Sequence, residues 1–486
     1  MRKLRLLLSL GTMLGLATGS AFADRFPPDN PGSPASPTGV GMVTLPSGFT
    51  EVGSAYTGGM GMEGETASPF SKPAPGTVNM RVNLYTNTFA QVAWWSGQNG
   101  SGNPSTALGN KQDPYGIYGY VRLDFGIDGQ SKSGIIYGGF AEIRENTGNA
   151  DNASAVSSGT SGFNAGNTLY ARQLWGYIGT NEAGVIRIGQ GFSAQSLLWV
   201  GGNDEFGFGG WVGGAELFPA SVTPVWPWPD SGNEYMAARV AYLSPVIAGF
   251  DAVVSFAPNN QTLYSANNCT AAFTGCISQS SSNSPADIAR FRNQFEIGLR
   301  YRNSFGPIGL AVSGIWMHSG AVSPVGAVVT APGSPAGTRF NGQNTGMFGA
   351  EVAINKYLAV GGNIHFGALN GSYGLQNKPI GAQTSTTQMV AWVAGARFTI
   401  PTMPLTLGGN YFNNKYQGQP GLPTQRVSQG FELGATYGLG PGIAIIAEYA
   451  WGNVKQGGFD FIAGTTGVAN NNVKVQTAAL GLAVRF

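Results

Sequence analysis

The chain has 486 residues, of which 10% are charged, 11% are aromatic and 76 are glycine. Soluble domains carry roughly 25% charged residues, so this composition argues against a set of ordinary soluble domains. Beyond the first 23 residues no run of about 18 apolar residues occurs, which excludes membrane-spanning helices. The 26 basic and 24 acidic residues nearly balance, so the chain has no basic field for nucleic acid.

The N-terminal segment has the three parts of a secretory signal peptide. Arg2, Lys3 and Arg5 form a basic start, the apolar stretch 6–16 follows, and the small-x-small pattern Ala-Phe-Ala ends at Ala23. The apolar stretch is too short to span a bilayer. We therefore expect residues 1–23 to direct export and to be removed near Ala23.

Residues 24–76 carry proline and glycine throughout and show no sustained hydrophobic period. Segments of this kind form loops or stay flexible. We expect an N-terminal extension, either flexible or plug-like, that precedes the folded domain.

From Thr77 the sequence alternates with period two. The register never slips between residues 77 and 95, which indicates one long strand. Its apolar face holds Val78, Met80, Val82, Leu84, Ala90, Val92 and Trp94, and its polar face holds Asn79, Arg81, Asn83, Asn87 and Gln91. Similar alternation recurs in 115–126, 134–145 and 292–303. We expect the apolar sets to face lipid and the polar sets to face a lumen, because successive side chains of a strand point to opposite faces.

The connections between these strands alternate between long and short. The long ones cover about 96–114, 146–167, 191–235, 258–291, 319–344, 369–387, 413–427 and 453–472. The short ones cover about 127–133, 180–184, 244–246, 304–307, 355–357, 401–404 and 440–442. Long external loops and short periplasmic turns are typical of transmembrane barrels. Fifteen connections predict an all-β, sixteen-stranded antiparallel transmembrane β-barrel over residues 77–486.

Cys269 and Cys276 lie in a Ser/Asn/Thr-rich segment with six residues between them. In an oxidising compartment this spacing favours a small disulfide-closed loop over two free thiols. A metal site is not expected there, because no histidine lies nearby and two ligands are too few.

Catalytic chemistry finds little support in the sequence. An outer-membrane hydrolase needs a nucleophile, a base and an orienting group within reach of one another. The chain has two histidines, His318 near a strand end and His365 on a polar strand face. Both are interpreted as lumen or interface residues, so we expect no enzyme, no metal and no cofactor.

The C-terminus and several internal segments resemble general Gram-negative porins. Leu480, Leu482, Val484 and Phe486 form an apolar face that looks like the signature read by barrel-assembly machinery. Segments 172–179 and 184–190 are similar to the strand–turn–strand before the third external loop of those porins, although Gln190 stands where they usually carry arginine. Segment 235–256 is similar to the hairpin after that loop. The resemblance implies a homotrimer in which each subunit holds one pore, narrowed by an inward-folded third external loop.

The third and longest connection, 191–235, is therefore the candidate constriction. Asp204 and Glu205, followed by Phe-Gly, look like the acidic Pro-Glu-Phe-Gly stretch of the family's constriction loop, and Glu216 lies further along. Arg122, Arg144 and Arg187 lie on the polar faces of nearby strands and form the expected basic wall. A third connection that lies in solvent instead of the lumen remains the alternative.

These features predict an outer-membrane porin, a passive water-filled channel for ions and small hydrophilic solutes. Its expected partners are outer-membrane lipid, further copies of the chain, the solutes and the barrel-assembly machinery. Two alternatives stay open. One is a transporter that is substrate-selective or plugged by residues 24–76, and the other is a non-conducting structural or adhesin barrel. Charged residues on the polar faces, such as Glu142, Glu296, Glu432 and Glu448, favour a wet lumen.

Overall fold

The structure is a computed structural model of the whole chain. It describes residues 74–96, 98, 114–147, 170–180, 182–202, 236–259, 292–320, 342–355, 357–368, 388–416, 418, 422, 424–440, 443–463 and 465–485. The expected signal peptide, residues 1–23, and nearly all of the expected extension 24–76 therefore lie outside the described residues.

The strands follow the predicted alternation closely. In chain order they are β1 (Thr77–Trp95), β2 (Tyr115–Gln130), β3 (Ile136–Thr147), β4 (Tyr170–Thr180), β5 (Gly184–Phe192), β6 (Met236–Leu243), β7 (Phe250–Asn259), β8 (Arg292–Phe305), β9 (Ile308–Gly320), β10 (Asn344–Ile354), β11 (Leu358–Ala368), β12 (Gln388–Thr399), β13 (Leu405–Tyr416), β14 (Arg426–Gly440), β15 (Ile443–Lys455), β16 (Phe459–Asp460), β17 (Thr465–Thr466) and β18 (Asn472–Arg485). One four-residue helix, α4 (Ala194–Leu197), lies among the described residues. Within the described ranges, no helix is long and apolar enough to cross a membrane.

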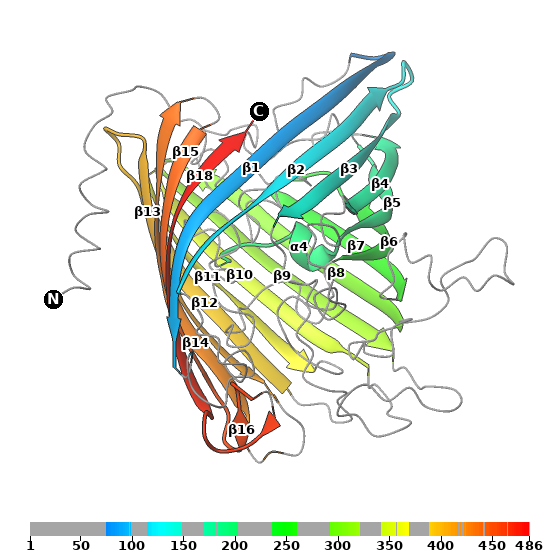
Figure 1. The fold of residues 1–486 in the computed structure, drawn as a ribbon. Coiled ribbons are helices and arrows are strands. Elements are labelled where there is room, and N and C mark those ends of the chain that lie inside the picture. The colour runs from blue at the N-terminus through cyan, green and yellow to red at the C-terminus, as the bar shows by residue number, and fades with distance from the viewer. Residues whose placement is uncertain are drawn as a thin grey trace, which may run out of the picture.

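Every long strand pairs antiparallel with its neighbours in the sequence, and β1 also pairs with β18. This last pairing closes a ring of sixteen strands within the described part of the chain (Figure 1). The two-residue strands β16 and β17 form a separate hairpin. The all-β, antiparallel prediction is confirmed, but the described strands number eighteen, because this small hairpin lies inside the connection expected at 453–472.

The apolar and polar faces of the strands lie as the alternation predicts. Met80 and Ile117 are 76% and 79% exposed on the outer surface, whereas Asp124 and Glu296 are 1% and 0% exposed on the inside. Soluble proteins show the opposite distribution, with apolar side chains inside. An apolar outer band around a polar interior is the pattern of a barrel whose solvent on the outside is lipid.

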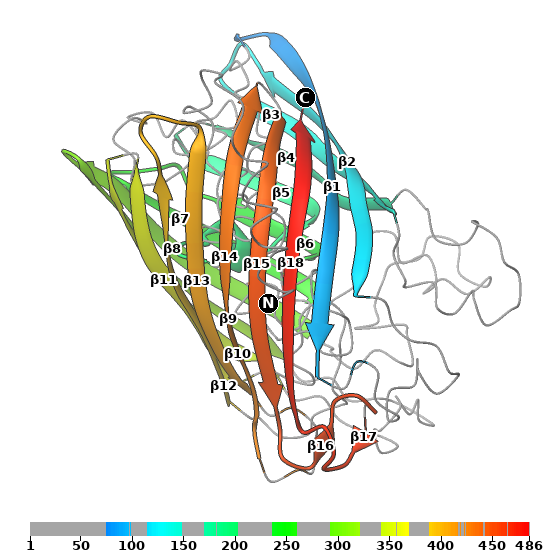
Figure 2. The ribbon, with the colours of Figure 1, turned by 60° about the vertical axis from the view of Figure 1, so that its left-hand side comes forward.

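The short connections lie at one end of the ring and the long ones at the other. Figure 2 shows the C-terminus and the start of β1 at the same end, while the β16–β17 hairpin lies at the opposite end. The chain therefore enters and leaves the barrel on the side of the short turns. In bacterial barrels that side is periplasmic.

Candidate functional site: a strap across the inner wall

The chain turns into the barrel directly after β5. We call residues 193–202 the strap. Its first turn is α4, capped by Ser193, whose side-chain oxygen accepts a hydrogen bond from the Ser196 backbone N–H at 3.4 Å. All ten strap residues are buried. An exposed surface loop would not bury every residue, so this part of the connection 191–235 packs against the inside of the barrel.

Hydrogen bonds join the backbone of the strap to inward-facing side chains of the wall. The Ala194 backbone N–H donates to Glu296 Oε2 on β8 at 2.6 Å. Arg300 Nη1, also on β8, donates to the Leu197 carbonyl at 3.2 Å. Asn363 Nδ2 on β11 donates to the Val200 carbonyl at 3.1 Å. The strap thus leaves β5, passes β8 and reaches β11 along the inner wall.

Glycine makes the last contact possible. A Cβ at Gly349 on β10 would lie 2.1 Å from the Val200 carbonyl oxygen, so any side chain there would displace the strap. Gly201 has φ of +70°, and its Cβ would lie 2.3 Å from the Gly362 carbonyl oxygen. Only glycine adopts this backbone freely and lets two chains approach so closely.

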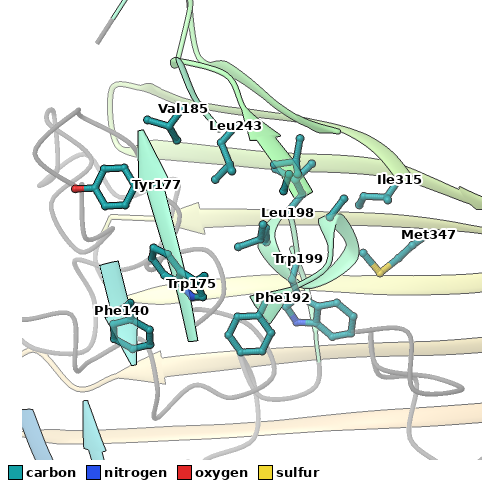
Figure 3. Packing of buried hydrophobic residues seen from close by; sticks show 14 of the residues in the cluster. Phe140, Trp175, Tyr177, Val185, Phe192, Leu198, Trp199, Leu243, Ile315 and Met347 are labelled. Carbon is teal, nitrogen blue, oxygen red and sulfur yellow. The ribbon is translucent and has the colours of Figure 1, made fainter. Parts of the chain in front are cut away.

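An apolar cluster fills the space between the strap and the wall (Figure 3). The strap contributes Leu197, Leu198 and Trp199, which are each 1% exposed. The wall contributes Phe140, Trp175, Tyr177, Val185, Leu243, Val253, Ile315 and Met347. Burial of apolar area fixes the strap in addition to its hydrogen bonds.

Ion pairs lie on the same wall, from β6 to β8. Arg239 Nη1 contacts Glu296 Oε1 at 3.0 Å and also donates to Ser255 Oγ at 3.1 Å. Arg300 Nε donates to Asp251 Oδ1 at 3.1 Å, and Arg302 pairs with the same carboxylate at 3.4 Å. The strap therefore rests on a network of buried charges that are largely paired with one another.

Arg239, Asp251 and Arg300 were not predicted from the sequence as site residues. Glu296 was expected on a polar strand face, and Arg300 and Arg302 lie in the alternating segment 292–303, but none of them was expected to hold the loop. The sequence feature that could have identified them is their position: they are charged residues at inward-facing positions of strands close to the longest connection. The alternation shows that Arg239 and Glu296 face inward, but it does not show that they pair across two strands.

Arg187 lies beneath the base of the strap and not on an open wall. It is 2% exposed, donates to the Phe192 carbonyl and lies with its guanidinium carbon 5.2 Å from the centre of the Trp175 ring. The sequence predicted that Arg187 would belong to a basic wall open to the lumen, but in the structure its side chain is buried. It instead holds the point at which β5 turns inward.

The other two basic positions face each other in the barrel wall. Arg122 on β2 pairs directly with Arg144 on β3, and two residues further along the same pair of strands Asp124 pairs with Glu142. The side chains of the acidic pair are buried inside the barrel, at 1% and 0% exposure. The strand register thus places the two predicted arginine positions opposite each other. The neighbouring acidic pair had not been predicted as part of the constriction.

Several predicted residues lie outside the described residues. They are the acidic positions Asp204, Glu205 and Glu216, the cysteines Cys269 and Cys276, and the terminal Phe486. Their roles remain predictions.

The two histidines lie on opposite faces of the wall. His365 is fully buried on the inner face of β11. His318 is exposed near the end of β9 and stacks with Trp316, with 5.8 Å between ring centres. Among the described residues, no three His, Cys, Asp or Glu side chains gather as metal ligands.

Known channel proteins also form barrels of antiparallel strands, and this chain is similar to one family of them. A model of Gram-negative porins matches residues 12–457 of this chain. The chain belongs to the Gram-negative porin family. The resemblance found in the sequence is thereby confirmed, and this porin is an outer-membrane channel protein. A search of curated proteins finds no match.

Solved porins share the fold at low sequence identity. The anion-selective porin from Comamonas acidovorans is 14% identical, with a TM-score of 0.50 over 84% of this porin and 100% of that chain. The outer membrane channel DcaP of Acinetobacter baumannii is 12% identical, with a TM-score of 0.50 over 85% and 99%. OmpF of Salmonella typhi is 13% identical, with a TM-score of 0.50 over 83% and 97%. These likenesses establish the fold.

Proposed function

We propose that this porin is a sixteen-stranded transmembrane barrel that passes ions and small hydrophilic solutes by diffusion, with the connection 191–235 as its constriction. The observation that supports the constriction most strongly is the buried strap. A loop that begins on the inner wall, from β5 to β11, reduces the width of the lumen at that level. Charged residues on the inner wall favour polar solutes over apolar ones, because an apolar solute gains nothing from such a surface.

The ring topology supports an electrostatic field across the lumen. The strap ends at Gly202, near β10 and β11, and the acidic positions Asp204 and Glu205 come next in the sequence. Arg122 and Arg144 lie on β2 and β3, eight positions away in the ring of sixteen strands. The acidic loop and this basic pair would then face each other across the lumen, with Glu216 further along the loop.

We also infer the context in which this channel works. Cleavage near Ala23 would leave residues 24–76 ahead of β1, on the side of the short turns. We infer no catalytic role, because His365 is buried in the wall and His318 faces outward. The homotrimer follows from the porin resemblance of the sequence, with one pore in each subunit.

The solute class is tested by swelling of liposomes that contain the purified protein. We expect the swelling rate to be high for small neutral sugars and to fall steadily as the sugar becomes larger, since a water-filled constriction selects by size. Liposomes made with heat-unfolded protein are the control. A folded barrel that admits none of the sugars would contradict passive diffusion.

A further inference from the structure

A second long connection, between β15 and β18, is also folded. We call its described residues, 456–463 and 465–471, the mouth hairpin. Its strands β16 and β17 pair, and the Gly467 backbone N–H donates to the Gly458 carbonyl at 2.8 Å. At its base, the Gln456 backbone N–H donates to the Asn471 carbonyl at 3.0 Å. These bonds give the connection a defined shape.

Asp460 organises the tip of the mouth hairpin. Its Oδ1 accepts hydrogen bonds from the backbone N–H groups of Ile462 and Ala463, both at 2.9 Å, and from Asn470 Nδ2 at 3.1 Å. Burial acts to raise the pKa of Asp460, but these donors outweigh it and hold the pKa below the ordinary value for aspartate. The carboxylate therefore stays ionised, and the turn stays hydrogen-bonded, at neutral and mildly acidic pH.

The apolar side of the mouth hairpin packs toward the lumen. Phe459, Phe461 and Ile462 are buried at 8%, 6% and 6% exposure. They share one cluster with inward-facing residues of β12, β13, β15 and β18, namely Met389, Ala391, Val393, Phe412, Tyr416, Ala450, Val454, Val473 and Val475. Figure 2 shows the hairpin at the end of the barrel where β15 ends and β18 begins. The hairpin therefore covers inner wall at the mouth and does not point away from the barrel.

Arg426, at the start of β14, holds the mouth hairpin in this position. Its Nε donates to Gln456 Oε1 at 2.9 Å, and Gln456 Nε2 donates in turn to the Thr424 carbonyl at 3.1 Å. Its guanidinium carbon lies 4.4 Å from the ring centre of Phe459 and 4.8 Å from that of Phe461. Cation–π contacts of a desolvated arginine are favourable, because the ring face attracts the positive charge. With Arg426 the contact surface extends over five neighbouring strands.

We propose that the mouth hairpin, held by Arg426, is a second constriction that limits solute size at the mouth before solutes reach the strap. This inference rests on the channel function above. The reason is geometric. The hairpin packs on the inner wall and therefore occupies part of the cross-section that water and solutes would otherwise fill. Arg426, Phe459 and Phe461 are then specificity-determining residues, although none of them lies in the connection 191–235.

The test is a porin with a shortened hairpin. Residues 458–469 are replaced by Asn-Gly, a two-residue loop that closes antiparallel strands. The hydrogen bond between Gln456 and Asn471 shows that the strands are already close enough for such a loop. We expect larger single-channel conductance and faster liposome entry of bulky sugars. Arg426→Gln should shift both readouts in the same direction by less, and Val468→Ser, at a position 79% exposed on the same hairpin, should match the parent.

A disulfide lock tests the position of the hairpin independently. A Cβ at Gly457 would lie 3.8 Å from Thr424 Cβ, within the roughly 3.5–4.5 Å range of disulfides. The pair Gly457→Cys and Thr424→Cys, with Cys269→Ser and Cys276→Ser, should form the bond on export. Oxidised and reduced forms should conduct like the parent, because the lock only fixes the hairpin where it already lies.

The outcomes separate this inference from the channel function. A shortened barrel that folds but keeps parental conductance and sugar entry would overturn the second constriction alone. A lock that fails to form, or that changes conductance, would show that the hairpin does not rest in this position, and it would also overturn the proposal. A folded parent that does not conduct would contradict the channel itself.

Discussion

Replacement of Glu296 by alanine is expected to destabilise the barrel by about 3–5 kcal/mol, the usual cost of leaving a buried charge without its partner. Glu296 and Arg239 have side chains that are 0% and 1% exposed and lie 3.0 Å apart. The same carboxylate accepts the Ala194 backbone N–H, so the strap loses its first anchor as well. Urea unfolding of the protein in micelles, followed by tryptophan fluorescence, measures the stability, and single-channel conductance reports the strap.

Two variants separate the roles of Glu296. Glu296→Gln keeps an oxygen for the Ala194 N–H and removes the charge, so it should lose stability but keep parental conductance. Glu351→Ala is the matched control, since Glu351 pairs with Arg397 at 3.7 Å, where the arginine side chain is 18% exposed. That variant should cost less and leave the conductance unchanged. Equal losses in Glu296→Ala and Glu351→Ala would show that the strap network has no special role.

Neutralisation of the acidic loop positions is expected to move ion selectivity toward anions. The change is Asp204→Asn, Glu205→Gln and Glu216→Gln together, which removes three negative charges and leaves the arginines of the wall. At an effective dielectric constant of about 20, two unit charges about 4 Å apart interact by about 4 kcal/mol, and salt screens part of this. Even a small fraction of that energy alters the relative permeability of potassium and chloride measurably.

The reversal potential in a potassium chloride gradient measures this effect. Glu182→Gln is the control, because it removes one charge from an exposed position in the short turn between β4 and β5, at the other end of the barrel. It should leave the reversal potential close to the parent value. If the triple variant also keeps the parental reversal potential and conductance, the connection 191–235 does not form the constriction.

The sequence predicted the strands well, because their period of two is a local property. β1 covers residues 77–95 as expected, and the described short connections fall within a few residues of their predicted places. The exposure of Met80 and the burial of Asp124 follow from the same parity. The bilayer sets both the length of a strand and the alternation of its side chains, so both can be predicted from the local sequence alone.

Packing inside the barrel was harder to predict, because it depends on strands that are distant in the ring. The mouth hairpin has strands of two residues, too short for a periodic signal. Its partners, such as Phe412 and Val475, are apolar although they occupy inward positions. Trp175 and Tyr177 show the same exception beneath the strap. Apolar residues at inward positions are thus the sequence signal for a segment that folds back into the lumen.

Single-channel recording of the purified parent protein in a planar bilayer tests the central claim most directly. A water-filled porin should add uniform conductance steps as it inserts, and each step should grow with the salt concentration. The gel mobility of the unheated sample establishes that the barrel is folded, since a closed barrel satisfies its backbone hydrogen bonds internally and resists unfolding. Folded protein that inserts without conductance steps would contradict the account and favour a plugged or structural barrel.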